Sequence, residues 1–243
     1  MKENINIVLP IAGLGKRFID GGYETPKPLV DFNGKYIIEK SLESLNLSGC
    51  NLIFIVRDEH IKSHGIDNIL REKFGRGIKI IAIDYVTEGA LCTCLLAEQY
   101  INNDQPLVIF TPDCYFEPVF NPKEVDEKYD GMVVTFDSDS KAHSYVVLDD
   151  NNYVIEAAEK KVISNNAVGG LYYYKRGSDF VKYSHQLISD DNRTKNEFYI
   201  CPVFNYFIKD GGKIGVEKNT KHLILGTPKD LERNISQDDF NIT

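Results

Sequence analysis

Three cations lie close to a glycine turn near the start of the chain, a combination suited to binding a polyphosphate. The turn is Gly13-Leu14-Gly15, Lys16 and Arg17 follow it directly, and Lys27 stands between two prolines. Glycines allow the backbone to fold into a concavity that approaches an anion closely. A helix beginning after the turn adds the partial positive charge of its N-terminus. The pattern therefore predicts a polyphosphate-binding loop.

Two widespread phosphate motifs do not fit this turn. A Rossmann dinucleotide site needs Gly-x-Gly-x-x-Gly, and Phe18 stands at the position of the third glycine. A Walker loop needs Gly-Lys followed by Ser or Thr, whereas Arg17 follows Gly15-Lys16. The order of glycine turn, Lys16-Arg17 pair and Pro26-Lys27-Pro28-Leu29 segment resembles instead the sugar-1-phosphate nucleotidyltransferase superfamily.

Members of that superfamily couple an NTP to a phosphorylated acceptor and release pyrophosphate, and the resemblance implies this reaction here. Because the attacking and leaving groups are both anionic, catalysis consists mainly of charge neutralisation and alignment. Arg17 is the candidate for the β- and γ-phosphates, since its planar fork suits a bidentate phosphate contact. Lys27, restricted by its flanking prolines, is the candidate for the α-phosphate. The other nucleotide-binding candidates in this segment are Ala12, Gly13, Gly15 and Lys16.

The nucleobase site is expected in the segment Asp84–Ala90. It resembles the family segment in which a base-reading glutamine is followed, five residues on, by a glycine. Gly89 matches this glycine, and Asp84 stands at the position of the glutamine. Glu88 directly precedes Gly89. A carboxylate only accepts hydrogen bonds at neutral pH, and the exocyclic amine of cytosine is a donor it can accept. We therefore predict CTP first and GTP second. The alternative interpretation is that Asp84 only ends a strand and that Glu88 is only an exposed side chain.

One carboxylate is a candidate metal ligand. Asp113 follows the apolar run Pro106–Phe110 and resembles the aspartate that ends the central strand of the family, where it would bind Mg²⁺ beside the α-phosphate. The family often has a second aspartate near Gly-Thr-Pro, but alignment on Gly226-Thr227-Pro228 places Ile224 there. The second ligand stays unassigned; Glu217 and the substrate phosphates are the alternatives.

The acceptor side is expected around Glu159-Lys160, which resembles the Glu-Lys-Pro motif whose lysine binds the acceptor phosphate. Glu197, at the predicted start of a helix, stands where the family often contacts sugar hydroxyls; a favourable charge at a helix start is the competing interpretation. Sugar-binding members usually carry Tyr-Gly where this chain has Tyr145-Val146. A smaller phosphorylated acceptor, such as a phospho-amino acid, therefore stays open beside a sugar-1-phosphate.

Short apolar runs alternate with amphipathic segments, which predicts parallel βαβ units. Strands are expected over Ile5–Ile11, Leu52–Val56, Lys79–Tyr85, Pro106–Phe110, Gly131–Phe136, Tyr145–Leu148 and Gly170–Tyr174. Helices are expected over Tyr36–Leu45, Ile66–Lys73, Ala90–Tyr100, Gly177–His185, Glu197–Lys209 and Pro228–Asn234. The fold class is a three-layer α/β/α Rossmann-like sandwich with a mostly parallel, mixed sheet, of the nucleotide-diphospho-sugar transferase type. Ligands of such sheets bind beyond the carboxyl ends of strands, where Gly13, Asp84 and Asp113 fall.

Length and composition indicate a single domain over residues 1–243, with a nucleotide-binding half (1–115), an acceptor-binding half (116–234) and a polar tail (235–243). The net charge of −8 argues against a nucleic-acid binder. No apolar run approaches membrane-spanning length. Five scattered cysteines indicate free thiols in a reducing cytoplasm. The oligomeric state stays open.

The sequence thus predicts a cytoplasmic nucleotidyltransferase that uses Mg²⁺ and moves NMP, with CMP from CTP favoured, to a phosphorylated small molecule. The resemblance implies a product used as an activated precursor of capsule or other surface polysaccharide. One alternative is an NDP-sugar glycosyltransferase, although its usual Asp-x-Asp is missing at Asp113-Cys114-Tyr115. The other is a non-catalytic nucleotide sensor.

Overall fold

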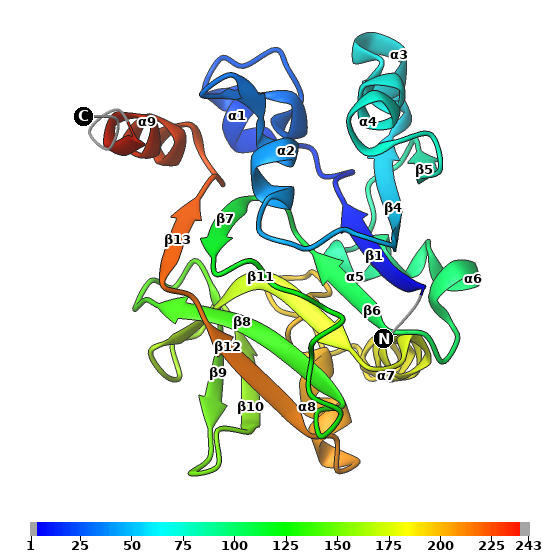
Figure 1. Cartoon of the computed structure of the whole chain (residues 1–243), viewed down its shortest axis with the longest axis vertical. Coiled ribbons are helices and arrows are strands. Elements are labelled where there is room, and N and C mark those ends of the chain that lie inside the picture. The colour runs from blue at the N-terminus through cyan, green and yellow to red at the C-terminus, as the bar shows by residue number, and fades with distance from the viewer. Residues whose placement is uncertain (1–3, 239–243) are drawn as a thin grey trace.

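A computed structural model of the chain describes residues 4–238, within which one large sheet of nine strands lies between two layers of helices (Figure 1). The first half of the sheet is parallel, in the order β6-β1-β4-β5. These strands are β1 (Ile5–Pro10), β4 (Cys50–Arg57), β5 (Lys79–Ile83) and β6 (Leu107–Phe110). Parallel strands buried on both faces read as continuous apolar runs, which is why the sequence reveals them.

The second half of the sheet is largely antiparallel. β11 pairs antiparallel with β6, β8 and β9, and β12 returns parallel to β8. The strands are β8 (Gly131–Asp137), β9 (Ser144–Leu148), β10 (Val154–Glu159), β11 (Asn166–Tyr174) and β12 (Ile214–Lys218). The predicted mixed sheet in a Rossmann-like sandwich is confirmed, with its parallel part in the first half of the chain.

Alternate residues of the central strand β1 enter two different cores, because side chains of a strand point to opposite faces. Ile7 and Leu9 belong to the core under α2 (Ile37–Leu42), α3 (Asp58–His64) and α4 (Ile66–Phe74). Val8 belongs to the core on the other face. The helices there are α5 (Ala90–Leu95), α6 (Glu98–Ile101), α7 (Gly177–Ser189) and α8 (Val203–Lys209).

A third, small core joins the two ends of the described chain. Its buried members are Phe18, Val30, Phe32, Ile37, Leu225 and Leu231. They come from α1 (Lys16–Asp20), from β2 (Asp31–Phe32) and the residue before it, from α2, from the residue after β13 (Lys221–Ile224), and from α9 (Pro228–Asp238). β2 pairs with the short strand β3 (Lys35–Tyr36). β13 pairs antiparallel with β7 (Cys114–Glu117), and α9 therefore lies beside α1 (Figure 1).

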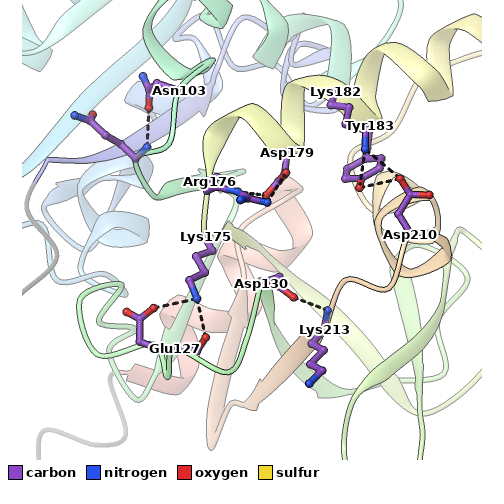
Figure 2. Close-up of polar contacts among 11 residues, drawn as sticks. Asn103, Glu127, Asp130, Lys175, Arg176, Asp179, Lys182, Tyr183, Asp210 and Lys213 are labelled. Atoms are coloured by element: carbon purple, nitrogen blue, oxygen red, sulfur yellow. Dashed lines mark hydrogen bonds and ion pairs between the residues drawn. The ribbon is translucent and has the colours of Figure 1, made fainter.

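Ion pairs and hydrogen bonds fix the loops at the edge of the sheet opposite the carboxyl ends of its parallel strands (Figure 2). Tyr174 at the end of β11 pairs with Leu107 at the start of β6, so this edge lies away from the carboxyl ends of the parallel strands. The contacts are Lys175 to Glu127, Lys213 N–H to Asp130, and Lys182 to Asp210, at 3.0, 3.0 and 3.1 Å. These contacts thus hold the loops at this edge in place.

Several predicted helices differ in extent from those in the structure. Helix α8 begins at Val203, not Glu197, because the Phe198 N–H donates to the Glu88 carbonyl and its own carbonyl accepts from Leu91 N–H. The helix expected over Ala90–Tyr100 is split into α5 and α6 by a turn at residues 96–97. Helix α9 continues to Asp238, so the expected tail is helical over 235–238; residues 239–243 lie outside the described part.

Some elements were not expected from the sequence at all. They are β2, β3, β7, β10, β12, β13 and α3, whereas the helix expected after the glycine turn is α1, which has five residues. Most are short or half-exposed, so their periodicity is weak. No helix within residues 4–238 combines the length and apolar character needed to cross a membrane. The five cysteines are free.

Candidate active site

The glycine loop forms one wall of a cavity of about 270 Å³ at the carboxyl ends of β1 and β6. Gly15 has φ +63°, a left-handed conformation that favours glycine, and it precedes the first residue of α1. Phe18 is 1% exposed and anchors α1 in the small core. Its burial leaves Lys16 and Arg17 at the cavity wall. The predicted loop residues Gly13 and Gly15 line the cavity, and the buried Ala12 lies between Ile11 and Gly13, which both line it.

Lys27 reaches the same cavity from a short 3₁₀ turn, Lys27–Leu29, with Pro26 before it and Pro28 inside it. Leu29 N–H donates to the Pro26 carbonyl over 2.8 Å, which closes the turn. The Lys27 Nζ lies 3.3 Å from Asp113 Oδ2, although 86 positions separate these residues in the sequence. A Cβ on Gly15 would lie only 3.7 Å from Lys27 Cβ, so the loop and the lysine are in contact.

A second carboxylate accompanies Asp113. A Cβ built on Gly226 would lie 3.9 Å from Asp113 Oδ2 and 3.8 Å from Asp230 Oδ2, so both carboxylates converge on the space above Gly226. The Thr227 hydroxyl donates to Asp230 Oδ2 over 2.6 Å and fixes its rotamer at the start of α9. Alignment on the Gly-Thr-Pro motif placed Ile224 at the missing ligand and did not find Asp230, because only the fold of the C-terminal segment brings it beside Asp113.

The metal expected at Asp113 fits this arrangement. Mg²⁺ in nucleotide enzymes is held by one or two carboxylates and the substrate phosphates, and Asp113 and Asp230 supply two. Across residues 4–238, no group of three or more His, Cys, Asp or Glu side chains is placed to hold a metal ion alone. Glu217 lies in β12, opposite Val134, and is not among the residues of either cavity.

A larger cavity of about 730 Å³ continues from the first, and Arg17 and Asp113 line both. Glu159 and Lys160, at the end of β10, lie in its wall. Lys160 has φ +53°, and its Nζ donates to the Tyr199 hydroxyl over 2.5 Å. Glu159 accepts a short hydrogen bond from the Ser144 hydroxyl, and burial raises the pKa of this carboxyl group. The structure therefore brings the two predicted acceptor residues to one cavity.

Two neutral histidines complete the larger cavity. His222 stacks on Phe136 with ring centroids 3.8 Å apart, and burial lowers the pKa of His222 to about 4. Burial also lowers the pKa of His143, which packs edge-on against the Phe136 ring. The Asn219 amide lies 3.0 Å from His222 Nδ1. No sequence pattern pointed to these side chains, since they share no metal-ligand spacing.

Glu88 lies in an exposed ion pair, which is the setting of the alternative interpretation. It forms a 2.6 Å ion pair with Arg193 and is 66% exposed. The Arg193 guanidinium lies 3.9 Å above the Phe198 ring, so the pair ties the loop before α8 to the start of α5. Gly89 has φ +134°, and a Cβ there would lie 2.3 Å from the Phe198 carbonyl oxygen. Gly89 is therefore required for this close backbone packing.

The remaining candidates are Asp84 and Glu197. Asp84 directly follows β5, as expected, but lines a separate cavity of about 350 Å³ rather than the one at the glycine loop. Gly13 and Asp113 do share one cavity. Glu197 is exposed in a turn bridged to Thr194, close to Tyr199. It begins no helix, so the helix-start interpretation of its charge is wrong.

Comparison with known proteins now defines the class. The family model for nucleotidyl transferases matches residues 6–214, and the chain belongs to this family. It is similar to a nucleoside-diphosphate-sugar pyrophosphorylase from Vibrio cholerae RC9, at 23% identity and TM-score 0.83, covering 95% of this chain and 100% of that one.

Two further solved structures share the fold. An inositol-1-phosphate CTP transferase from T. maritima has 16% identity and TM-score 0.72, with 98% of each chain covered. A CTP:phosphocholine cytidylyltransferase from Streptococcus pneumoniae has 17% identity and TM-score 0.73, covering 98% of this chain and 99% of that one. No curated protein matches the chain.

Proposed function

We propose that this nucleotidyltransferase moves CMP from CTP to a phosphorylated small molecule and releases pyrophosphate. The observation that carries the proposal is the meeting of two cavities at Arg17 and Asp113. The first holds the glycine loop and Lys27, and the second holds Glu159 and Lys160. An NTP in the first and an acceptor phosphate in the second would face each other across these shared residues.

The roles follow from charge and position. Lys27 would neutralise the α-phosphate, where negative charge builds as the acceptor oxygen attacks. Arg17 would hold the outgoing pyrophosphate, and Lys160 would orient the acceptor phosphate for in-line attack. Mg²⁺, when bound by Asp113 and Asp230, would supply further positive charge at the phosphates.

The acceptor is a sugar-1-phosphate or a smaller phosphorylated compound such as a phospho-amino acid. The larger cavity supports both, because it combines the Lys160 ammonium group with a buried Glu159 and with aromatic side chains. The product would serve as an activated precursor for a capsule or another surface polysaccharide. CTP is favoured because Asp84 offers hydrogen-bond acceptors in a cavity of its own, where the neighbouring Lys62 is paired with Asp58 instead.

A pyrophosphate-release assay with Mg²⁺ tests the proposal. The four ribonucleotides and dTTP would be crossed with sugar phosphates and phospho-amino acids. Release with CTP, and a shift toward UTP in Asp84→Asn, would support cytidylyl transfer, whereas Glu88→Gln should leave the preference unchanged. Release with UTP or dTTP alone would refute the cytidylyl assignment and keep the class. Transfer of a sugar without pyrophosphate would indicate a glycosyltransferase, and NTP binding without turnover a sensor.

A further inference from the structure

The Arg57 side chain is buried without the partners that a buried cation needs. It ends β4, it is 9% exposed, and its Nε and Nη1 atoms have no hydrogen-bond partner among the described residues. Burying a charged group is costly unless hydrogen bonds or an opposite charge compensate it. The guanidinium group therefore has two enclosed donors that no described protein atom satisfies, and the accessible part of the Arg57 side chain lines two cavities.

One surface carboxylate forms a long ion pair with Arg57 but gives it no hydrogen bond. Glu59 Oε2 lies 3.7 Å from Nη2, beyond hydrogen-bond distance, on a side chain that is 73% exposed. Lys62 is paired with Asp58. His60 is neutral at physiological pH, since burial and the Arg57 charge lower its pKa. Of the nearby groups, this leaves Asp84 as the carboxylate that lines the same 350 Å³ cavity without a salt bridge to these cations.

Arg57 also lies between the phosphate loop and the segment after β5. Strand β4 runs between β1 and β5 in the sheet (Figure 1), and Arg57 pairs in register with Ile83, the residue before Asp84. A smaller cavity of about 130 Å³ is lined by Arg57 together with Gly13, Gly15 and Lys27. Its guanidinium group therefore faces both the glycine loop and Asp84.

We propose that Arg57 reads the nucleobase of the bound NTP by donating a hydrogen bond to a ring acceptor. This inference rests on the proposed function and names the residue that recognises its nucleotide. A nucleotide whose phosphates contact the glycine loop and Lys27 directs its base past β1, toward the ends of β4 and β5. That direction brings the base to Arg57 and Asp84.

The pair of side chains is complementary to cytosine. Asp84 only accepts, and the exocyclic amine of cytosine donates. Arg57 only donates, and cytosine carries the N3 and O2 acceptors beside that amine. Uracil in the same pose would place its O4 acceptor against the Asp84 carboxylate, which is unfavourable. Arg57 thus supplies base affinity, and Asp84 supplies the choice between cytosine and uracil.

The test compares two probes, CTP and inorganic tripolyphosphate, by titration calorimetry. The variant Arg57→Met removes the N–H donors and keeps the apolar stem. We expect CTP binding to weaken about tenfold or more, as for the loss of a hydrogen bond to a charged group, and tripolyphosphate binding to stay unchanged. The control Arg76→Met removes an exposed arginine from the turn before β5, at the other end of the sheet, and should change neither.

Two results would overturn the assignment. Equal weakening of both probes would mean that Arg57 acts on the phosphates, and unchanged CTP binding would mean that Arg57 does not contact the base. If Arg57→Met fails to unfold cooperatively, Arg57→Lys replaces it; this variant keeps the charge, moves the donor, and should still lose CTP affinity selectively. If the wild-type protein binds CTP but never releases pyrophosphate, the proposed activity is refuted and the role of Arg57 is not. That role is decided only by how the variant changes the affinity for CTP relative to the affinity for tripolyphosphate.

Discussion

Replacing Lys27 with methionine separates the catalytic use of its charge from its structural use. The substitution keeps most of the side-chain stem and removes the ammonium group that lies 3.3 Å from Asp113. The lysine and aspartate side chains are 21% and 41% exposed, so solvent screens the ion pair substantially. The loss of stability should therefore be about 1 kcal/mol or less, which lowers Tm by about 2–4 °C in a chain of this size.

The loss of turnover should be much larger. A preorganised donor at the position where charge develops contributes about 10²–10³-fold to kcat when it is removed from other active sites. Lys27 occupies that position if the α-phosphate lies between the glycine loop and Asp113. We thus expect Lys27→Met to lower kcat by about 10²-fold or more, while the fold remains intact.

Pyrophosphate release under saturating substrates measures kcat, and urea denaturation measures the free energy of unfolding. Lys128→Met is a matched control, because Lys128 Nζ also lies 3.3 Å from an aspartate oxygen, on Asp126, far along the chain from the glycine loop. That variant should keep its turnover. Near-normal kcat in Lys27→Met, or an equal loss in Lys128→Met, would refute the reasoning.

Three more outcomes follow from the site. Asp230→Asn should raise the Mn²⁺ concentration needed for half-maximal binding of the metal–nucleotide complex. Electron paramagnetic resonance of Mn²⁺ measures this binding. Unchanged metal binding would remove Asp230 from the metal site. Gly89→Ala should lower the free energy of unfolding by about 1–3 kcal/mol, because its Cβ meets the Phe198 carbonyl at positive φ, whereas Gly77→Ala, in open space, should change it little. The pKa of His222 is lowered to about 4 in the fold, so the unfolded chain binds more protons between about pH 6.5 and 4. Stability should fall as pH drops through this window, and His222→Phe should flatten that slope; an unaltered slope would contradict the burial argument.

Local signals in the sequence singled out residues that the structure brings to one cavity. The glycine turn, Lys27 and Asp113 each lie directly at a strand end or in a proline-restricted turn, so short-range patterns suffice to find them. Asp230 and Arg57 could not be found this way. Asp230 becomes a site residue only because β13 and α9 return to the glycine loop. Arg57 has the sequence context of an ordinary strand-end arginine, and only its burial with two unpaired N–H donors in the fold sets it apart.

The errors share a physical cause. Phe198 and its neighbours have the apolar spacing of a helix start, but their backbone groups bond to Glu88 and Leu91 on another segment. Lys195 and Asn196 both have positive φ, which makes a tight turn before this stretch. Tertiary contacts between distant segments decided the conformation there, and a local pattern contains no information on them.

The small core has a consequence for how the enzyme is made. Phe18 and Phe32 leave the ribosome early, whereas Leu225 and Leu231, which cover them, are among the last described residues to be synthesised. Until then the nascent chain carries an uncovered aromatic surface beside its glycine loop, of the kind that chaperones bind. The carboxylate of Asp230 arrives with the same segment. Asp113 and Asp230 are therefore brought together only after the segment that carries Leu225 and Leu231 has been synthesised, and a chain that stops before it lacks both the cover and the second carboxylate.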